Sequence, residues 1–380
     1  MLFLISPIIS ISQWVQISSG GITQPLDGIH FLDTQNGFCS GGLTNILTTD
    51  DAGASWTTTS LTGIRDYDFL DNTFGYGASI SGYSMKRTTN GGSSYAGLTP
   101  INSSSLWAVS ATSSTVAYYV GVSGILWKVT GGSTVTAMNS GETTVLTDIV
   151  FTNTTTGFIV VQQGRIKKTV NSGVTWTDVY TGTTTLSEMH FVDANIGYAV
   201  GNALVIKTID GGQNWTALTT GDLHLYYGVH FFDANHGIVV GTNGTIIYTS
   251  DGGNTWLVQS SGTTEHLKDV RMLSATSAVV IGDNGTILKN STISTVGVND
   301  VDNLLELSIY PNPVVDLITI RSNSLMNSVV LFDLKGDVLY QETNFNSQNK
   351  TIDFSSLPAG VYLLSVNSTN GKSLQKIVKY

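Results

Sequence analysis

A unit of about 40 residues recurs through most of the chain, and this repeat limits the possible folds more than any single motif. Its clearest mark is a short turn that ends in an aromatic residue, with copies that read TTDDAGASW, RTTNGGSSY, KTVNSGVTW, KTIDGGQNW and YTSDGGNTW. One glycine of this turn recurs at Gly53, Gly92, Gly132, Gly173, Gly212 and Gly253. The steps between these glycines are 39, 40, 41, 39 and 41 residues, so the chain is built from copies of one supersecondary unit.

A second marker lies in each period and allows four strands to be placed. It reads HFLDTQNG, DFLDNTFG, VFTNTTTG, HFVDANIG and HFFDANHG in the copies that keep it. The four strands are the one with this Phe, a GYAVG-type strand, an IIYTS-type strand and the strand that opens at Trp. Asn243-Gly244 and Asn284-Gly285 predict hairpin turns between the second and third strands. Four antiparallel strands every ~40 residues predict a blade of a β-propeller.

The strand that opens at Trp gives the number of blades. Its aromatic residue, or the residue in its place, stands at Trp14, Trp56, Tyr95, Val135, Trp176, Trp215 and Trp256, which predicts seven blades. After Thr292 the chain has lost this strand, whereas QWVQISSG at Trp14 parallels TWLVQSSG at Trp256. We therefore expect the first strand to complete the last blade and close a ring over residues 13–295. Closure leaves no free sheet edge.

Composition excludes several classes of function. The net charge is −10, and only 12% of residues are charged, which disfavours nucleic-acid binding. Cys39 is the single cysteine, so neither a disulfide framework nor a cysteine zinc site is expected. The six histidines show no metal-ligand spacing. No interior stretch reaches the roughly 18 to 20 apolar residues of a membrane helix. The sequence predicts no metal and no cofactor.

The two ends of the chain differ from the repeats. Residues 1–12, MLFLISPIISIS, predict an export signal whose small-x-small site is Ser10-Ile11-Ser12, although a basic start is missing; an N-terminal strand is the alternative. A polar linker is predicted at 296–303. Beyond it, 304–380 alternates short apolar runs with turns such as Lys335-Gly336 and Asn370-Gly371. This tail predicts a small Ig-like β-sandwich, so the fold class is all-β throughout.

The repeated turn S/T-x-D-x-G-x-T/S-W resembles the Asp-box, or BNR repeat. The whole unit resembles the repeat of photosystem II assembly factor-type propellers, with sortilin and xyloglucanase propellers as more distant likenesses. The Asp carboxylate can accept backbone N–H groups across the turn, and the glycine supplies a positive φ. We expect a structural role for the box residues Asp51, Gly53, Trp56, Asn171, Gly173, Trp176, Asp210, Gly212, Trp215, Asp251, Gly253 and Trp256.

The tail resembles the type A C-terminal sorting domain of the type IX secretion system of Bacteroidetes. The residues that carry the likeness are Pro311, Asn312, Pro313, Gly336, Gly360, Tyr362, Lys376 and Lys379. The resemblance implies passage by the Sec route and then across the outer membrane of a Gram-negative bacterium. It also implies that the secretion machinery recognises the tail and usually removes it before release or surface anchoring. An ordinary terminal Ig-like module is the alternative.

Aligning the repeats singles out two positions on the first strand of each blade, which is expected to lie innermost. Just before the apolar anchor stand His30, Asp68, Trp107, Val150, His190, His230 and Arg271. Two residues earlier stand Gly28, Asp66, Ser105, Asp148, Glu188, Gly228 and Asp269. Side chains two apart share one face of a strand, so these positions predict two layers around the channel. They predict a site for a cation or small polar ligand at the channel mouth; hydrogen bonding between blades is the alternative.

The loops that enter the inner strands predict a contact patch on the rim. Its residues are Arg65, His224, Tyr226, Tyr227 and His266, although the two tyrosines could instead pack at blade edges. A sialidase is improbable because the propeller holds only Arg65, Arg87, Arg165 and Arg271 and no Arg-Ile-Pro segment. The presence of the sorting tail and the lack of a basic patch both argue against a role in photosystem assembly. The sequence therefore favours a non-enzymatic binding or scaffold module for protein or polysaccharide, with a xyloglucanase-type glycoside hydrolase as the alternative.

Overall fold

The computed structural model describes residues 14–41, 45–59, 64–79, 85–99, 105–293, 307–333, 337–368 and 371–380. The chain divides into two compact units, Met1–Val298 and Asn299–Tyr380. The predicted export signal (1–12) and linker (296–303) lie outside the described residues. The all-β prediction is confirmed, because the regular structure consists of strands and three short 3-10 turns. The described residues include no helix that is long and apolar enough to span a membrane.

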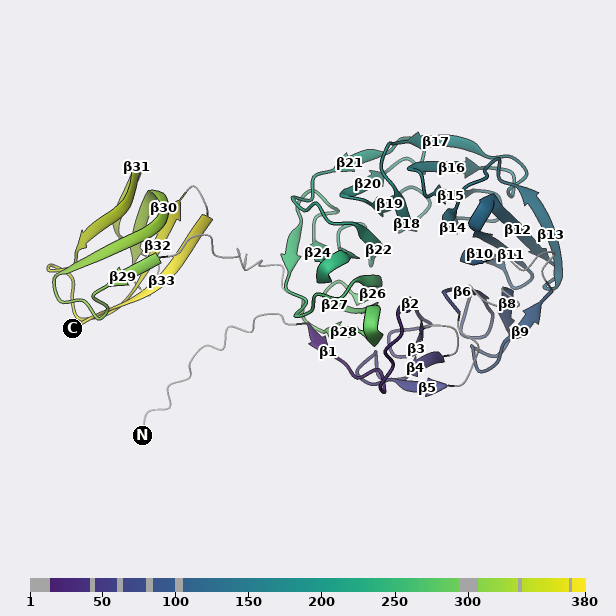
Figure 1. Cartoon of the computed structure of the whole chain (residues 1–380), viewed down its shortest axis with the longest axis horizontal. Helices are drawn as coiled ribbons and strands as arrows, with labels where there is room; N and C mark the ends of the chain where they lie inside the picture. The colour runs from purple at the N-terminus through teal and green to yellow at the C-terminus, as the bar shows by residue number, and fades with distance from the viewer. Residues whose placement is uncertain are drawn as a thin grey trace. The chain divides into compact units, whose positions relative to one another are not determined.

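Four-stranded antiparallel sheets surround a common axis in the first unit (Figure 1). Sheets 1 to 3 comprise β2 (Leu26–Phe31), β3 (Gly37–Gly41), β4 (Asn45–Thr49), β5 (Thr57–Thr59); β6 (Asp66–Phe69), β7 (Gly75–Ala78), β8 (Met85–Thr88), β9 (Ala96–Leu98); β10 (Leu106–Ser113), β11 (Val116–Gly121), β12 (Ile125–Thr130) and β13 (Thr134–Asn139). Sheets 4 and 5 comprise β14 (Leu146–Phe151), β15 (Gly157–Val161), β16 (Arg165–Thr169), β17 (Thr177–Thr181); β18 (Leu186–Phe191), β19 (Gly197–Gly201), β20 (Leu204–Thr208) and β21 (Thr216–Leu218).

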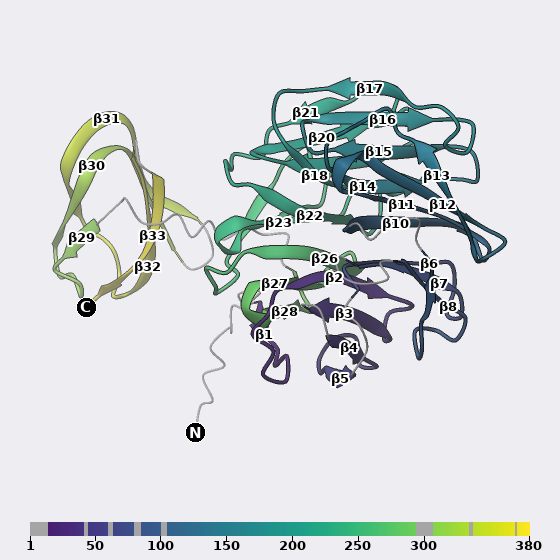
Figure 2. The same ribbon diagram turned by 45° about the vertical axis from the view of Figure 1, so that its right-hand side comes forward.

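Two further sheets bring the described total in this unit to seven. Sheet 6 comprises β22 (Tyr226–Phe231), β23 (Gly237–Gly241), β24 (Ile246–Thr249) and β25 (Leu257–Gln259), and sheet 7 comprises β26 (Leu267–Ser274), β27 (Ser277–Gly282), β28 (Ile287–Asn290) and β1 (Val15–Gln16). The turns η1 (Val122–Gly124), η2 (Thr242–Gly244) and η3 (Asp283–Gly285) join second to third strands. The first strands of neighbouring sheets contact each other in a closed ring. Figure 2 shows β5 and β17 at opposite outer edges of the propeller.

The ring closes through the N-terminal strand, as the sequence predicts. Sheet 7 has the order β1-β28-β27-β26, with Val15 opposite Lys289. Trp14, which precedes β1, is 3% exposed and packs with Tyr248, Met272 and Leu288. One strand from the start of the propeller thus completes the sheet formed by its last residues.

The second marker of the repeat is explained by contact between its Phe and its Gly. A Cβ built on Gly37, Gly75, Gly157, Gly197 or Gly237 would lie 2.3 to 2.8 Å from the ring of the Phe in the same copy. The Phe side chain on the first strand therefore occupies the space that a side chain on the second strand would need. Each of these rings also contacts a neighbouring aromatic ring. Phe231, for example, stands edge-on to Trp256 with ring centroids 6.2 Å apart and stacks on Tyr198 with centroids 3.5 Å apart.

Replacing Gly237 by alanine is expected to lower the unfolding free energy by about 1 to 3 kcal/mol, because the new Cβ overpacks a filled core. That Cβ would lie 2.3 Å from the ring of Phe231, which is 2% exposed. Urea denaturation of the full chain measures the change. The double variant Phe231→Leu, Gly237→Ala should lose less stability than the sum of the two single variants, because the smaller Leu side chain leaves room for the new Cβ. Strict additivity would contradict this account of the repeat.

The Asp-box residues form hydrogen bonds that fold their own turns. Asp251 accepts from the backbone N–H of Thr255 at 2.9 Å and from the hydroxyl of Thr255 at 2.7 Å. Gly253 has φ +89°, the left-handed conformation that glycine adopts most readily. Similar bonds from Ser55 hold the pKa of Asp51 at about 2. Asn171 accepts the N–H of Thr175 at 3.0 Å in the same way. These contacts support the structural role that the sequence predicts for the boxes.

The second unit is a small β-sandwich whose sheet has the order β29-β30-β32-β33, with β31 paired to β30. Its strands are β29 (Leu307–Tyr310), β30 (Leu317–Phe332), β31 (Val338–Asp353), β32 (Gly360–Ser368) and β33 (Gly371–Lys379). Asn312 of the Pro-Asn-Pro turn fastens the last strand: its Nδ2 donates to the carbonyl of Lys376 at 2.8 Å, and its Oδ1 accepts the N–H of Val378 at 2.9 Å.

The predicted sorting residues fall into different environments within this unit. Lys376 is exposed, whereas Lys379 is 8% exposed and its ammonium donates to the carbonyl of Val315. Tyr362 is buried and donates its hydroxyl to the carbonyl of Pro358. Gly336 lies outside the described residues.

Candidate functional site

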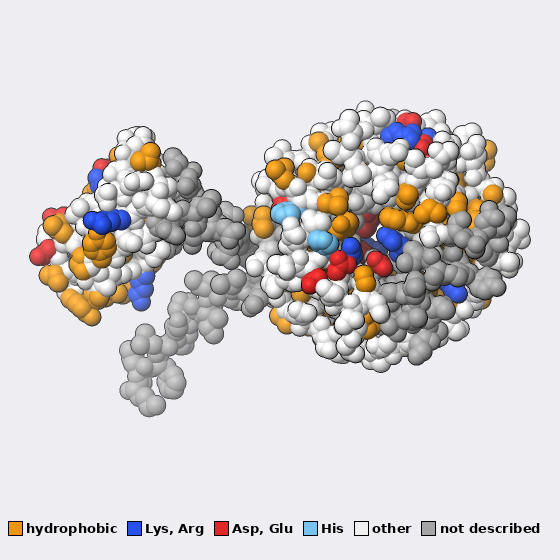
Figure 3. All heavy atoms as spheres, in the orientation of Figure 1, with side chains coloured by type: hydrophobic (Ala, Val, Ile, Leu, Met, Phe, Trp, Pro, Cys, Tyr) orange, Lys and Arg blue, Asp and Glu red, His pale blue; other side chains and the backbone are white. Residues whose placement is uncertain are grey.

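A cavity of about 660 Å³ occupies the hub of the propeller. The first strands of all seven sheets contribute side chains to its wall. Figure 3 shows acidic and basic side chains gathered at the centre of the ring. A smaller cavity of about 400 Å³ shares His30, His190 and Arg271 with it and continues toward the opposite face. We call the larger cavity the funnel.

The funnel is lined by three layers of side chains, one more than the sequence predicts. In six of the seven sheets the pairing of the first two strands shifts by one residue near the start of the first strand, as between Leu26 and Gly28. Such a β-bulge interrupts the alternation of faces, so the extra residue also faces the channel. The resulting upper layer consists of Asp27, Arg65, Trp107, Thr147, Ser187, Tyr227 and Lys268.

Below the upper layer lie the two predicted layers, with one correction. The middle layer comprises Gly28, Asp66, Ala108, Asp148, Glu188, Gly228 and Asp269, and the lower layer comprises His30, Asp68, Ser110, Val150, His190, His230 and Arg271. The sequence alignment placed Ser105 and Trp107 in these layers of sheet 3, which is wrong. Its apolar anchor is Ala111 rather than Ala108, because Ala108 pairs with Val120 as Gly28 pairs with Ser40.

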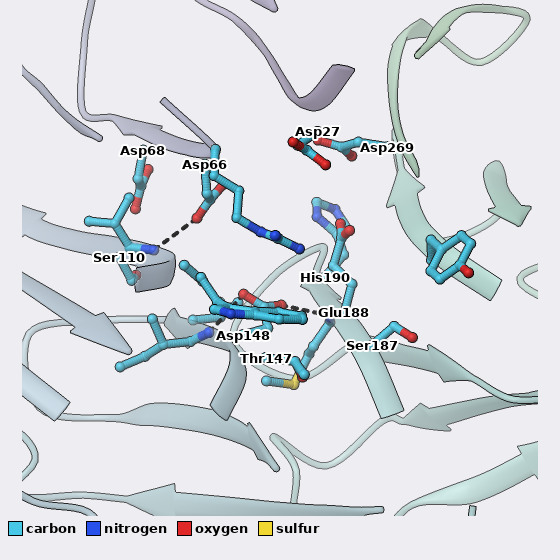
Figure 4. A pocket seen from close by; sticks show the side chains of 18 of the residues that line it. Asp27, Asp66, Asp68, Ser110, Thr147, Asp148, Ser187, Glu188, His190 and Asp269 are labelled. Carbon is cyan, nitrogen blue, oxygen red and sulfur yellow. Dashed lines mark hydrogen bonds between the residues drawn. The ribbon is translucent and has the colours of Figure 1, made fainter. Parts of the chain in front are cut away.

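Three middle-layer carboxylates connect neighbouring sheets. Asp66, Asp148 and Asp269 each accept the N–H of the next residue through Oδ1, at 2.8, 2.7 and 2.7 Å. Through Oδ2 they accept N–H groups of the adjacent sheet from Val109, Met189 and Ile29, at 2.8, 2.7 and 3.0 Å. Figure 4 shows these side chains around the cavity. These three carboxylates therefore form hydrogen bonds between blades, which is the alternative role that the sequence left open.

Glu188 differs from the other middle-layer carboxyls. It forms no hydrogen bond or ion pair with any residue that the structure describes, although it lines the funnel between Asp148 and Asp269 (Figure 4). Burial raises its pKa well above the usual 4.5, the charges of Asp269 and Asp148 raise it further, and Arg271 opposes them. Burial likewise raises the pKa of Asp148 to about 7. Among the middle-layer acids, Glu188 is thus the one without a partner in the described part of the chain.

The variant Glu188→Gln is expected to gain stability over the native chain as pH rises. The unfolded chain releases this proton above its ordinary pKa, whereas the folded chain retains it, so native stability falls with rising pH through this group. Gln cannot ionise and removes that loss. Urea denaturation at about pH 4.5 and about pH 8 should therefore show a larger difference between variant and native chain at the higher pH. Glu265→Gln, on a loop outside the funnel wall, should show no such trend; a pH-independent difference for Glu188→Gln would contradict the assignment.

The lower layer contains three histidines and one arginine. Burial lowers the pKa of His30 and of His190 to about 3, so both rings are neutral near pH 7. The rings of His190 and His230 have centroids 4.4 Å apart. His190 donates through Nε2 to the carbonyl of Phe231 at 3.0 Å, and His230 accepts the N–H of Met272 at 3.3 Å. Within the described ranges, no three His, Cys, Asp or Glu side chains are placed to share a metal ion.

Charged and aromatic side chains pair at the mouth. The guanidinium of Arg65 lies over the ring of Trp107, 4.1 Å from its centroid, and the ammonium of Lys268 lies over Tyr227 at 4.4 Å. The side chain of His224 is 43% exposed and meets Asp222 with Nδ1 and Oδ1 2.8 Å apart. His266 accepts the N–H of Asn243 at 3.2 Å, and its ring lies 6.3 Å from that of Tyr227. Arg65, Tyr227, His224 and His266 therefore remain candidates for contact with a ligand.

Tyr226 is not a rim residue. Its side chain is fully buried among Tyr198, Val229 and Phe231, and its hydroxyl donates to Thr220 at 3.1 Å. Adjacent strand residues face opposite sides, and the core side of this strand is the side of Tyr226.

Comparisons with known families agree with this architecture. Residues 308–380 match the family described as "Secretion system C-terminal sorting domain". The second unit is thus similar to a secretion sorting domain over most of its length. Residues 220–294 match the family described as "Photosynthesis system II assembly factor YCF48", which carries the BNR repeat. A search of curated proteins gave no match.

Solved structures show the same propeller fold. A structure of YCF48 bound to D1 peptide has a TM-score of 0.60 at 17% identity and covers 76% of this chain and 100% of its own. YCF48 from Cyanidioschyzon merolae has a TM-score of 0.59 at 16% identity, covering 73% and 98%. The Pan2 WD40 domain of Neurospora crassa also scores 0.59, at 11% identity, covering 76% and 98%. The first unit thus has a β-propeller fold with a match to the BNR repeat, and the match of the second unit to a sorting domain indicates export from the cell.

Proposed function

We propose that the protein is an exported, non-enzymatic binding module that holds a protein or polysaccharide ligand at the mouth of the funnel. The observation that carries this proposal is the funnel itself: a cavity of about 660 Å³ with polar and charged groups converging on it from seven strands. Concave sites with a few convergent polar groups are where proteins most often bind ligands. The likeness to a propeller that is bound to a peptide adds support.

Export is proposed to follow the type IX route through the sorting domain. Deleting residues 304–380 should leave the propeller inside the cell envelope, whereas the full chain reaches the medium or the cell surface. Fractionation with an antibody against the propeller measures this. Appearance of the truncated chain outside the cell would contradict the proposed route.

Binding is tested with the full chain and a mouth variant. The double variant Trp107→Ala, Tyr227→Ala removes two aromatic side chains from the upper layer, and the loss of such contacts typically weakens binding about tenfold or more. A glycan array and pull-down from culture supernatant identify ligands, whose affinity for both proteins is then measured. Val258→Ala, at a 56% exposed position on the outer strand β25, is the matched control. A ligand bound equally well by the mouth variant would place the binding surface elsewhere.

A glycoside hydrolase is the second candidate, favoured by the pKa of about 7 for Asp148, which suits a general acid. Both carboxyl oxygens of Asp148 accept backbone N–H groups, however, as do both oxygens of Asp269. Carboxyls committed to the backbone are poorly placed for proton transfer to a sugar. Release of reducing sugar from plant or microbial glycans, lost in Asp148→Asn, would favour the hydrolase over the binding module.

A further inference from the structure

The charges of the funnel point to the kind of group that it receives. Its described wall holds six carboxyl groups but only three basic side chains, Arg65, Lys268 and Arg271. Arg65 and Lys268 already lie over aromatic rings at the mouth, and Lys268 also meets Asp283 at 3.5 Å. Arg271 lies in the lower layer, with Nη1 3.9 Å from Oδ1 of Asp269. An anion that passed Arg65 and Lys268 would meet the carboxyls of the middle layer before it reached Arg271.

One of those carboxyls has hydrogen-bonding capacity to spare. Asp66, Asp148 and Asp269 have both oxygens engaged by backbone N–H groups, whereas Glu188 has no partner among the described residues. The side chain of Glu188 is half-buried and lines the cavity, so its carboxyl can accept hydrogen bonds from a ligand that enters the funnel. Glu188 lies one residue below the upper layer, which is about 3.3 Å of strand. A ligand side chain that enters at the mouth can therefore reach the carboxyl of Glu188.

We propose that the funnel binds a primary ammonium group, carried by a lysine side chain of a peptide, through Glu188. The proposal rests on the binding function argued above and specifies its ligand. An ammonium group is a compact charge with three donors, so the single carboxylate of Glu188 can pair with it while its other donors stay with water. A metal ion would need several ligands at short range, which the described side chains do not provide.

Binding of an ammonium group should be coupled to proton release. Glu188 is faced by Asp148 on β14, Asp66 on β6, and Asp269 and Arg271 on β26, while its neighbour β22 contributes Tyr227 to the same wall. Burial and the three acids around it raise the pKa of Glu188 well above 4.5 in the empty funnel, which favours the protonated form. When the ammonium enters with its own charge, the carboxylic acid loses its proton to solvent and the carboxylate pairs with the ligand. Affinity should therefore rise with pH below the pKa of the free lysine side chain.

The test compares short peptides of the form acetyl-Gly-Gly-X-Gly-Gly-amide on the full chain. With X as lysine, isothermal titration in buffers of different ionisation enthalpy should show binding at millimolar concentration and the release of about one proton per peptide near neutral pH. With X as acetyl-lysine or norleucine, which keep length without charge, binding should be at least about tenfold weaker. The variant Glu188→Gln should lose the preference and the proton release, whereas Glu265→Gln should keep both.

Each outcome separates this proposal from the binding function on which it rests. Equal affinity for lysine and acetyl-lysine peptides, no binding of the lysine peptide, or unchanged binding by Glu188→Gln overturns the ammonium site. If a glutamate-containing peptide binds and the Trp107→Ala, Tyr227→Ala variant loses it, the funnel is a ligand site for a different group. If the mouth variant leaves the binding of every ligand unchanged, the proposed function fails as well.

Discussion

Replacing Trp14 by alanine is expected to lower the unfolding free energy of the propeller by about 3 to 5 kcal/mol, the usual loss for a buried aromatic side chain. Trp14 is 3% exposed and belongs to the core between sheets 6 and 7, where it packs with Tyr248, Met272 and Leu288. It also anchors β1, the outer strand of sheet 7. The substitution therefore opens a cavity at the point where the two ends of the ring meet. Denaturation by urea, followed by tryptophan-independent far-UV signal, measures the change.

Val15 provides the matched control for Trp14. It is the next residue, it pairs with Lys289 in the same strand, and its side chain is 56% exposed. Val15→Thr keeps the β-branched shape and should change stability by less than about 0.5 kcal/mol. If Trp14→Ala is as stable as Val15→Thr, the N-terminal strand does not close the ring. Deleting the strand should in addition expose the edge of β28 and promote association that depends on concentration.

The repeat revealed the architecture because its marker residues satisfy purely local requirements. Phe231 and Gly237 are six residues apart and touch, and Asp251 folds the turn that contains it. Both relations recur in most copies, so spacing alone placed four strands in each period. The parallel between Trp14 and Trp256 likewise identifies the closing strand from the sequence alone.

The channel layers were predicted less well because they depend on strand register. A period of two assigns alternate residues to one face, but the bulge at the start of the inner strand puts an extra residue on that face. Trp107 and Tyr227 thus belong to an upper layer that alternation cannot reveal. Sheet 3 lacks the Phe anchor, so the alignment of its first strand with the other repeats is wrong by three residues. The pairing of Ala111 with Ala117 establishes the correct register.

The length of its side chain distinguishes Glu188 from the residues at the equivalent position of other sheets. Aspartate stands at the equivalent position in sheets 2, 4 and 7, where its short side chain accepts the N–H of the very next residue. Glutamate is one methylene longer, which moves its carboxyl away from that N–H group. A change of length at a repeat position thus marks the acid that the backbone leaves free.

An ion network in sheet 4 gives the second large effect. Glu142, on the loop before β14, has a side chain 5% exposed and pairs with Arg165 and with Lys167, the latter at 3.0 Å. The side chain of Lys167 is itself 9% exposed. Among the described residues, Glu142→Ala leaves this buried ammonium with Asp178 alone as its ionic partner, at 3.3 Å and with a side chain 41% exposed. We expect a loss of about 2 to 4 kcal/mol in unfolding free energy, because removing one partner of a buried pair strands the other charge.

Asp178 shows why burial, rather than the number of ion pairs, decides this effect. It contacts the same Arg165 and Lys167, at 3.6 and 3.3 Å, but lies near solvent, so Asp178→Asn should cost less than about 1 kcal/mol. A double-mutant cycle completes the test: Lys167→Met removes the stranded ammonium and should recover much of the loss in Glu142→Ala. Equal losses for Glu142→Ala and Asp178→Asn, or no recovery with Lys167→Met, would mean that desolvation of Lys167 does not govern the stability of this sheet.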